Sequence, residues 1–211
     1  MVKLTDILTL DNLKYTDKIE PKHQKAIDDI GPVFMDFDIK QFMSTPPPRN
    51  SSNKTFTEIR DLEKLDLDID VNAADKTKEY FQNRIESFGL NYPKETIDNL
   101  VKDSRGIVHI LKYYYNRPRP KQVAKALGLK FHSEPLKSGT TPSYPSGHSA
   151  QSRLIARYLC HVYPGYEKEI MELADEVSNS RLVAKIHYKS DSDFGIELGD
   201  ALYKHYKYNR K

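Results

Sequence analysis

Apolar residues recur at intervals of three and four along most of this chain, the spacing that gathers them on one face of an α-helix. Strict alternation, the pattern of a β-strand, occurs only in the segment Leu65 to Val71, LDLDIDV. We interpret that segment as a turn with solvated aspartates between two helices; the alternative is a short edge strand. The sequence therefore predicts an all-α fold, a single-domain helical bundle. Its predicted apolar faces contain Ile59, Leu62, Tyr80, Phe81, Ile85, Phe88, Ile97, Leu100, Val101, Ile107, Val108 and Leu111.

The stretch of residues 44–53, STPPPRNSSN, is predicted to be non-helical because prolines remove backbone donors and restrict their neighbours. It divides the chain into an N-terminal helical arm packed on the core, residues 1–43, and a main domain, residues 44–211. A chain of 211 residues with 38% hydrophobic and 30% charged residues suits one globular domain. In the last third, helices are predicted at residues 148–163, 167–187 and 193–206.

No apolar run approaches the roughly 18 consecutive residues that a membrane-spanning helix requires. Asp6, Asp11 and Asp17 interrupt the N-terminus, so it lacks the continuous hydrophobic centre of a secretory leader. We expect no integral membrane segment and a cytoplasmic location, or a periplasmic one if a leader has been removed. The single cysteine, Cys160, excludes an intrachain disulfide and is interpreted as an inert, buried side chain.

The formal net charge of +3 is small for this length, and the basic tail KHYKYNRK is interpreted as a solvated helix end rather than a nucleic-acid site. We therefore expect no nucleic-acid partner. Asp68, Asp70, Asn72 and Glu79 match the positions of calcium ligands in an EF-hand loop, but Ala73 stands where that loop needs glycine. No metal site is predicted.

Two long cations, Lys112 and Arg119, stand seven positions apart around the predicted end of a helix. Pro118 stops that helix, so Arg119 is expected just beyond it, where both cations can point into the same volume. The alternative is a simple basic helix cap, with Arg117 as its third member. His109 lies on the same helical face as Lys112 and is given no role.

The tetrapeptide Pro145, Ser146, Gly147, His148 marks the junction between a long loop and a new helix. Glycine lets the backbone approach an anion, a helix N-terminus offers free N–H groups, and the serine adds a hydroxyl donor. The histidine beside them can exchange a proton near neutral pH. The tetrapeptide is thus predicted to form an anion cradle; the alternative is a serine N-cap followed by a surface histidine.

A third segment, from Ser180 to Asp191, is placed late in a predicted helix. His187 and Asp191 are four positions apart and would share a face, so the carboxylate could accept from one imidazole nitrogen and leave the other free as a nucleophile. Arg181 would lie about 120° around the helix from His187, a gap that its length can bridge. The alternative is an ordinary surface ion pair.

The patterns K-x6-R-P, P-S-G-H and S-R-x5-H-x3-D, in this order and spacing, resemble the type 2 phosphatidic acid phosphatase superfamily. That superfamily also holds the class A bacterial acid phosphatases and the vanadium-dependent haloperoxidases. The segments TPPPRNSSNKTF, AADKTKEYF and SDSDFGIELGDAL look like the acid phosphatases, so the similarity extends over roughly residues 44–206. The resemblance implies a helical bundle of the acid phosphatase and haloperoxidase type.

By this resemblance the chain is a metal-independent enzyme that hydrolyses phosphomonoesters. Lys112, Arg119 and Arg181 would bind the phosphoryl oxygens, and Ser146 with the N–H of Gly147 would complete the cradle. Fixed cations and donors aimed at these oxygens stabilise the charge of a phosphoryl-transfer transition state. The implied partner is a small-molecule phosphate ester, and a homo-oligomer is expected.

The resemblance also assigns the reacting groups. His187 would attack phosphorus and form a phosphohistidine, and Asp191 would hold its tautomer. His148 would protonate the departing oxygen and then activate water. No cofactor is expected, although vanadate could occupy the phosphate site. Two alternatives stay open: a vanadium-dependent haloperoxidase, and a non-catalytic protein that binds phosphorylated ligands or nucleic acid.

Overall fold

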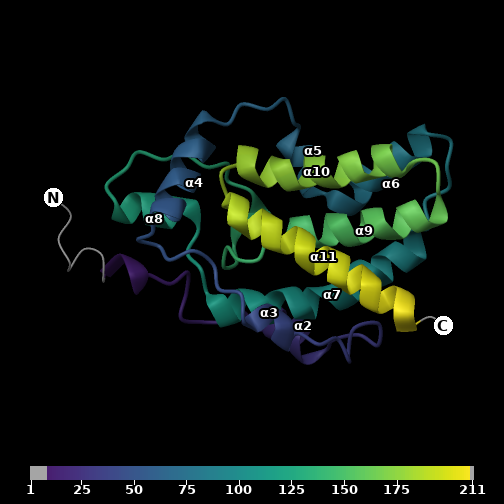
Figure 1. Cartoon of the computed structure of the whole chain (residues 1–211), viewed down its shortest axis with the longest axis horizontal. Helices are drawn as coiled ribbons and strands as arrows, with labels where there is room; N and C mark the ends of the chain where they lie inside the picture. The colour runs from purple at the N-terminus through teal and green to yellow at the C-terminus, as the bar shows by residue number, and fades with distance from the viewer. Residues whose placement is uncertain (1–8, 210–211) are drawn as a thin grey trace.

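Four long helices form the body of the molecule in the computed structural model, which describes residues 9–209 (Figure 1). Helix α9 lies between α10 and α11 and also packs on α7. The described residues contain no β-strand, so the predicted all-α fold is confirmed. The long helices are α7 (Lys94–Tyr115), α9 (Gly147–Val162), α10 (Glu167–Val183) and α11 (Lys189–Asn209). The shorter elements are α2 (Pro21–Asp28), α3 (Lys40–Met43), α4 (Asn53–Lys64), α5 (Val71–Asp75), α6 (Thr77–Ser87), α8 (Pro120–Ala126) and the 3₁₀ turn η1 (Lys137–Gly139).

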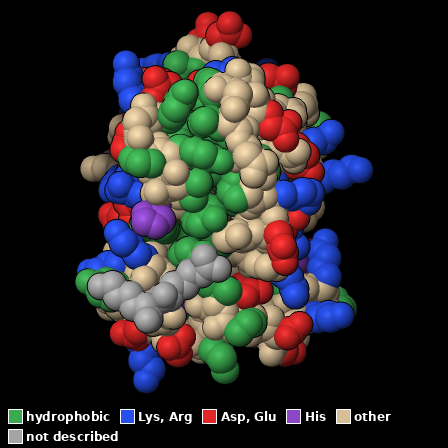
Figure 2. Space-filling model, turned by 90° about the vertical axis from the view of Figure 1, so that its right-hand side faces the viewer, with side chains coloured by type: hydrophobic (Ala, Val, Ile, Leu, Met, Phe, Trp, Pro, Cys, Tyr) green, Lys and Arg blue, Asp and Glu red, His purple; other side chains and the backbone are tan. Residues whose placement is uncertain are grey.

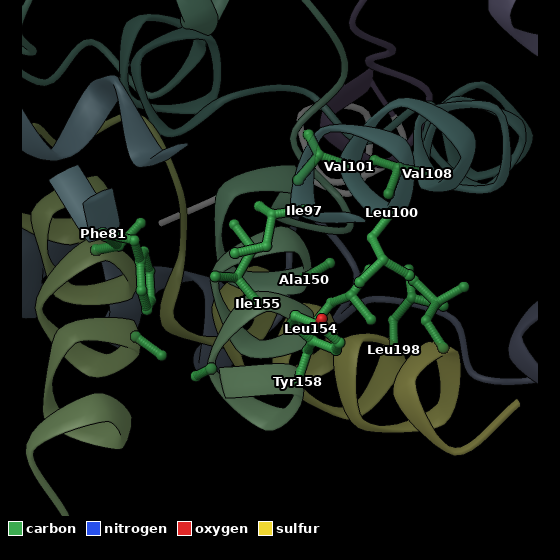
Figure 3. Close-up of a cluster of buried hydrophobic side chains, with 14 of the residues drawn as sticks. Phe81, Ile97, Leu100, Val101, Val108, Ala150, Leu154, Ile155, Tyr158 and Leu198 are labelled. Carbon is green, nitrogen blue, oxygen red and sulfur yellow. The ribbon is translucent and has the colours of Figure 1, made fainter. Parts of the chain in front are cut away.

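Helix α9 is the centre of the main hydrophobic core (Figure 3). Its side chains Leu154 and Ile155 are fully buried and lie among Ile97 of α7, Leu198 of α11 and Phe81 of α6. These are positions at which apolar residues follow the helical spacing, so each helix turns its apolar face toward α9. Burial of each such side chain contributes roughly 1.5–3 kcal/mol before the loss of chain entropy is counted.

Glycines bring α11 unusually close to α9. A Cβ atom on Gly195 would lie 2.5 Å from the carbonyl oxygen of Ser146, and one on Gly199 would lie 2.5 Å from that of Ala150. Both distances are shorter than a real Cβ contact, so only glycine permits this approach. Because the first contact is made at Ser146, the glycines also fix the start of α11 against the Pro145–His148 segment.

The N-terminal arm shares the main core with the rest of the chain. Phe34, Phe37 and Phe42 belong to the same buried cluster as α7 and α9. Helix α2 packs on α7, where a Cβ on Gly106 would lie 2.5 Å from the carbonyl oxygen of Ala26. Residues 44–52 of the proline-rich stretch lie between α3 and α4 without helical structure, as predicted, while Asn53 is already the first residue of α4. The division of the chain at residue 43 stays a prediction.

The prediction of a continuous helix over residues 167–187 is wrong, because α10 ends at Val183. The N–H of Lys185 donates to the carbonyl of Leu182, and the N–H of Ile186 donates to that of Arg181. This pair of bonds is a Schellman motif, which ends a helix with a residue in the left-handed conformation. That residue is Lys185, with φ 56°. Glycine usually occupies this position, so a lysine there carries no local signal of a helix end.

The next helix also begins earlier than predicted, since α11 starts at Lys189 rather than at residue 193. The segment LDLDIDV forms no strand. Residues 65–70 are irregular, and the side chain of Asp70 caps α5 by accepting from the N–H groups of Asn72 and Ala73. The interpretation of this segment as a connection between two helices is therefore confirmed. One of its aspartates, Asp70, is a helix cap and not simply a solvated side chain.

Hydrophobic side chains are also visible on the surface. Figure 2 shows the end of the molecule at the right of Figure 1, where they form a stripe bordered by charged residues. Met35, Tyr114 and Tyr208 are the most exposed large hydrophobic residues described. Among the helices described, none has both the length and the apolar composition needed to cross a bilayer.

The close contact of α9 and α11 predicts a specific sensitivity to added volume. Gly199→Ala should lower the free energy of unfolding by about 1–3 kcal/mol, because the new methyl group meets backbone that has no room to move. Urea denaturation monitored by circular dichroism measures the change. Gly139→Ala is the matched control, since its Cβ would meet nothing closer than 3.9 Å, and it should stay within about 0.5 kcal/mol of wild type. Equal stability of the two variants would contradict the packing argument.

Candidate active site

The three sequence segments meet where the ends of five helices converge (Figure 1). Lys112 lies in the last turn of α7, and Arg119 is the N-cap of α8, beyond the helix end as predicted. Gly147 and His148 open α9, and His187 lies in the connection between α10 and α11. All five line a cavity of about 250 Å³.

His187 and Asp191 interact, although not as neighbours on one helix. The imidazole Nδ1 lies 3.2 Å from Asp191 Oδ2, across the start of α11 rather than within a continuous helix. On the other side of the ring, Arg119 Nη1 lies 3.0 Å from Nε2. An ionised carboxylate only accepts and a guanidinium only donates, so the network assigns the hydrogen to Nδ1 and the lone pair to Nε2.

Burial decides the protonation state of this imidazole. His187 is 2% exposed, and burial followed by the charge of Arg119 lowers its pKa well below the usual range. The hydrogen bond to Asp191 opposes this shift but does not overcome it. His187 is therefore neutral in the free protein at ordinary pH, and its Nε2 lone pair is hydrogen-bonded to Arg119 Nη1.

The carboxylate of Asp191 is completely buried and fully hydrogen-bonded. It accepts from Arg117 Nη1 at 2.6 Å, from the N–H of Tyr188 at 3.0 Å and from the hydroxyl of Ser143. Burial alone would raise the pKa of Asp191, but Arg117 and then His187 outweigh it and hold that pKa well below its usual range. Asp191 is thus a permanent negative charge behind the imidazole.

Arg117 and Glu58 are site residues that sequence reasoning missed. Arg117 is 2% exposed, stacks on the ring of Tyr188 at 3.8 Å and contacts Glu58 Oε2 at 3.4 Å. Glu58, on α4, also accepts from the N–H of Ser190 at 2.7 Å and so caps the start of α11. Arg117 is therefore not part of the simple basic helix cap that the sequence left as an alternative. Glu58 carried no sequence signal.

The two cations of the first segment are held by backbone carbonyl groups rather than by carboxylates. Lys112 Nζ donates to the carbonyl of Pro142 at 2.6 Å, and Arg119 donates to those of Thr141 and Ile186. Burial and then Arg119 lower the pKa of Lys112 well below its usual range, and burial lowers that of Arg119 to about 10. Desolvated cations without a counter-ion favour the binding of an anion.

Arg181 is fully buried and does not line the cavity. Its Nη1 donates to Asp75 Oδ1 at 2.5 Å, and its Nη2 donates to the carbonyl of Val71 at 3.1 Å, both on α5. The expectation that Arg181 reaches His187 around one helix is wrong, because the helix ends between them. Ser138, which lines the cavity, donates its hydroxyl to the same Asp75 oxygen at 2.5 Å and accepts from Arg181 Nη1 at 3.4 Å.

Asp75 also contacts the second histidine. His148 Nε2 lies 3.2 Å from the carbonyl oxygen of Asp75 and 3.3 Å from its Oδ1. The hydrogen bond to His148 is the largest cause of a pKa of Asp75 far below its usual range. Burial lowers the pKa of His148, while Asp75 raises it in part. The sequence offered no sign of this carboxylate, which stands 73 residues from its histidine.

Ser146 takes the role of helix cap that the sequence left as its alternative. Its hydroxyl is fully buried and accepts from the N–H of Ser149 at 3.3 Å, and its own N–H donates to the carbonyl of Asp191 at 2.9 Å. It lies behind the cavity wall with Asp191 and Arg181, whereas Gly147 is part of the wall. A Cβ on Gly147 would lie 3.3 Å from Val108 and 3.7 Å from Lys112 Cε.

Two further histidines belong to the same cavity. His109 lines it, and so does His23 of α2, which the sequence did not connect with the site. Their rings stack with centroids 4.4 Å apart, and His23 Nδ1 lies 2.8 Å from the hydroxyl of Tyr113. Burial lowers the pKa of both rings, that of His109 to about 3, so both are neutral.

Comparison with known proteins gives relatives for this arrangement. A non-specific acid phosphatase of Salmonella typhi is 34% identical over 90 residues, and that of Salmonella typhimurium is 33% identical over 90 residues. Each alignment covers 42% of this chain, and the chain spans about a third, 35%, of the length of these relatives.

Two solved structures are also similar. A bacterial vanadium-dependent iodoperoxidase has a TM-score of 0.48 at 16% identity, over 92% of this chain and 51% of that one. A transmembrane phosphatidylglycerolphosphate phosphatase of the PAP2 type from Bacillus subtilis has a TM-score of 0.41 at 18% identity, over 97% of this chain and 92% of that one.

The family assignment comes from a family model. The model of the PAP2 superfamily matches residues 103–208, which is half of the chain and contains all three motif segments. It agrees with the resemblance that the motifs indicated. This chain therefore belongs to the PAP2 superfamily.

Proposed function

We propose that this protein is a phosphatase that hydrolyses phosphomonoesters through a phosphohistidine on His187. One observation carries the proposal: a neutral imidazole is held at Nδ1 by a buried carboxylate, while its Nε2 stands in a cavity with cations and a second histidine. A nucleophile, a group that orients it and an acid–base partner in one cavity are the parts that covalent phosphoryl transfer requires.

In the first step, Nε2 of His187 attacks phosphorus and the bond from phosphorus to the leaving oxygen breaks. The nitrogen gains positive charge as the bond forms, and Asp191 stabilises that charge through Nδ1. His148 gives its proton to the leaving oxygen, so the alcohol departs neutral. Asp75 supplies the counter-charge that keeps protonated His148 stable until the proton is transferred.

In the second step, water attacks the phosphohistidine and the phosphorus–nitrogen bond breaks. His148, now neutral, accepts the proton of the attacking water, and phosphate leaves with His187 restored. Both half-reactions thus use the same two imidazoles, with His148 acting first as acid and then as base. The site returns to its starting protonation state after each turnover.

The phosphoryl oxygens are bound by Lys112, Arg119 and the N–H of Gly147 at the start of α9, in this proposal. Charge spreads over these oxygens in the transition state, and cations already stripped of water stabilise it without reorganisation. The predicted contacts of Arg181 and Ser146 stay part of the proposal, with Arg181 reaching the phosphate only when its bonds to α5 are exchanged. The acid phosphatase names of the Salmonella relatives support the reaction class.

Loss of the nucleophile should abolish the reaction. His187→Ala should reduce kcat for para-nitrophenyl phosphate by at least about 10³-fold, because no other group can form the intermediate. Acid-quenched wild type incubated with ³²P-labelled substrate should carry an acid-labile phosphoryl group that this variant lacks. His132→Ala, an exposed histidine outside the cavity, is the control and should keep wild-type activity. Substantial turnover by His187→Ala would rule out the nucleophile assignment.

The side chains supply the charge stabilisation themselves, so chelation should not affect the rate. Treatment with 10-fold excess EDTA over any contaminating metal, followed by gel filtration, should leave kcat for para-nitrophenyl phosphate unchanged.

Orthovanadate, which takes the shape of the pentacoordinate phosphorus, should inhibit competitively in the same cavity. Loss of activity that a divalent ion restores would contradict metal independence, and bromide oxidation by peroxide after vanadate loading would favour a haloperoxidase instead.

The pH profile should report His148. Because its pKa in the free protein lies below the ordinary value and it acts first as an acid, kcat/KM should fall as pH rises through that lowered pKa. Asp75→Asn removes the group that raises this pKa, so the alkaline limb of the profile should move to lower pH. Asp98→Asn, which removes a carboxylate on α7 outside the cavity, is the control. An alkaline limb that stays in place in Asp75→Asn would exclude Asp75 as the counter-charge.

A further inference from the structure

The cavity has more positive charge than one phosphoryl group requires. Besides Lys112 and Arg119, its wall contains Lys22, Arg105 and Lys137, all with exposed positions at the surface. No aspartate or glutamate is among the described residues that line it. Uncompensated like charges repel each other across a small volume, so an arrangement of this kind is stabilised by an anion that lies among them.

The inner cations, Lys112 and Arg119, and the outer cations, Lys22, Arg105 and Lys137, lie at different depths in the cavity. Arg105 and Lys112 stand seven residues apart on the same face of α7, which separates their backbones by about 10 Å along the helix axis. Lys112 is buried beside the nucleophile, whereas Arg105 is exposed. An anion bound by Arg105 is therefore separate from the phosphoryl group that reacts.

The outer cations are available for a ligand. The ion pairs found within residues 9–209 include neither Arg105 nor Lys137. Lys22 pairs with Glu20 at 2.9 Å, but both side chains are about half exposed or more. An exposed pair of this kind contributes about 0–1 kcal/mol, so a phosphate competes with it easily.

The part of the cavity wall between the inner and the outer cations is polar but uncharged. It is formed by the stacked imidazoles of His23 and His109, which their surroundings keep neutral. Neutral rings with ring nitrogens suit a hydroxylated carbon chain better than a third anionic group. His23 reaches this position because α2 packs on α7 at Gly106, and Lys22 precedes it on α2.

From these observations we propose a second anion subsite, formed by Lys22 of the N-terminal arm with Arg105 and Lys137, at the mouth of the cavity. The substrate class it selects is a small bisphosphate, whose two phosphates are separated by a short polar carbon chain. The proposal rests on the proposed phosphatase function, because it assigns the inner phosphate to His187. It gives the N-terminal arm, which lies outside the family match, a part in substrate choice.

The test compares matched substrates on the full chain. Wild type should hydrolyse a hexitol 1,6-bisphosphate with kcat/KM roughly tenfold or more above that of the hexitol 6-phosphate, as charge-assisted contacts to one phosphate predict. Arg105→Gln with Lys137→Gln, and separately Lys22→Gln, should bring this ratio toward one. The two phosphates of inorganic pyrophosphate are too close together to reach both subsites. Its kcat/KM should therefore show no such advantage over that of the hexitol 6-phosphate.

A surface variant separates a specific site from general attraction of anions. Lys168→Gln removes one exposed lysine on α10, outside the cavity, and should leave the ratio at its wild-type value. Equal kcat/KM for the two hexitol phosphates in wild type, together with turnover of para-nitrophenyl phosphate, overturns the second subsite and leaves the phosphatase function standing. A ratio that Lys168→Gln lowers as much as the cavity variants do also overturns it. Inactivity toward every phosphate ester overturns both proposals.

Discussion

The buried pair of Arg117 and Asp191 is the interaction on which the site depends. Both side chains are shielded from water, and the guanidinium donates to the carboxylate at 2.6 Å. Two charges removed from water are unfavourable alone, and removal of one partner from such a pair typically costs about 3–5 kcal/mol. The pair is therefore tolerated only with its complete set of hydrogen bonds, and that requirement fixes the surrounding segments in one arrangement.

Those segments come from distant parts of the chain. Glu58 on α4 contacts Arg117 and caps α11, while Ser143 donates to Asp191 from the loop before α9. The carboxylate that results is rigid, permanently ionised and aimed at Nδ1 of His187. Stability and chemistry thus use the same network: the bonds that satisfy a buried charge also orient the imidazole that we propose as nucleophile.

The sequence predicted the fold class and most of the cavity because these depend on local patterns. Helical spacing identified the bundle, and Lys112, Arg119, Gly147, His148 and His187 were recognised by motif and lie around one cavity. Helix ends were less predictable. Lys185 has a left-handed backbone conformation, and a glycine at that position would have indicated a helix end. With a lysine there, the prediction of a continuous helix was wrong.

Partners from remote segments escaped prediction for a different reason. Glu58, Asp75 and His23 are ordinary residues on ordinary helices, and only tertiary packing brings them to the site. Nothing in their local sequence distinguishes them from solvated neighbours. The site residues that belong to a sequence motif were therefore predicted. Those that only tertiary packing brings to the site were not.

The turn at the end of α10 also explains why five residues separate Arg181 from His187. The hydrogen bond from the N–H of Ile186 to the carbonyl of Arg181 closes a ring of six residues, and His187 is the first residue outside it. The number of residues between Arg181 and His187 is thus set by the size of this hydrogen-bonded turn and not by the repeat of an α-helix. A chain lengthened or shortened by one residue there would lose the ring itself, so the fold constrains the length of this interval more tightly than the identity of the residues within it.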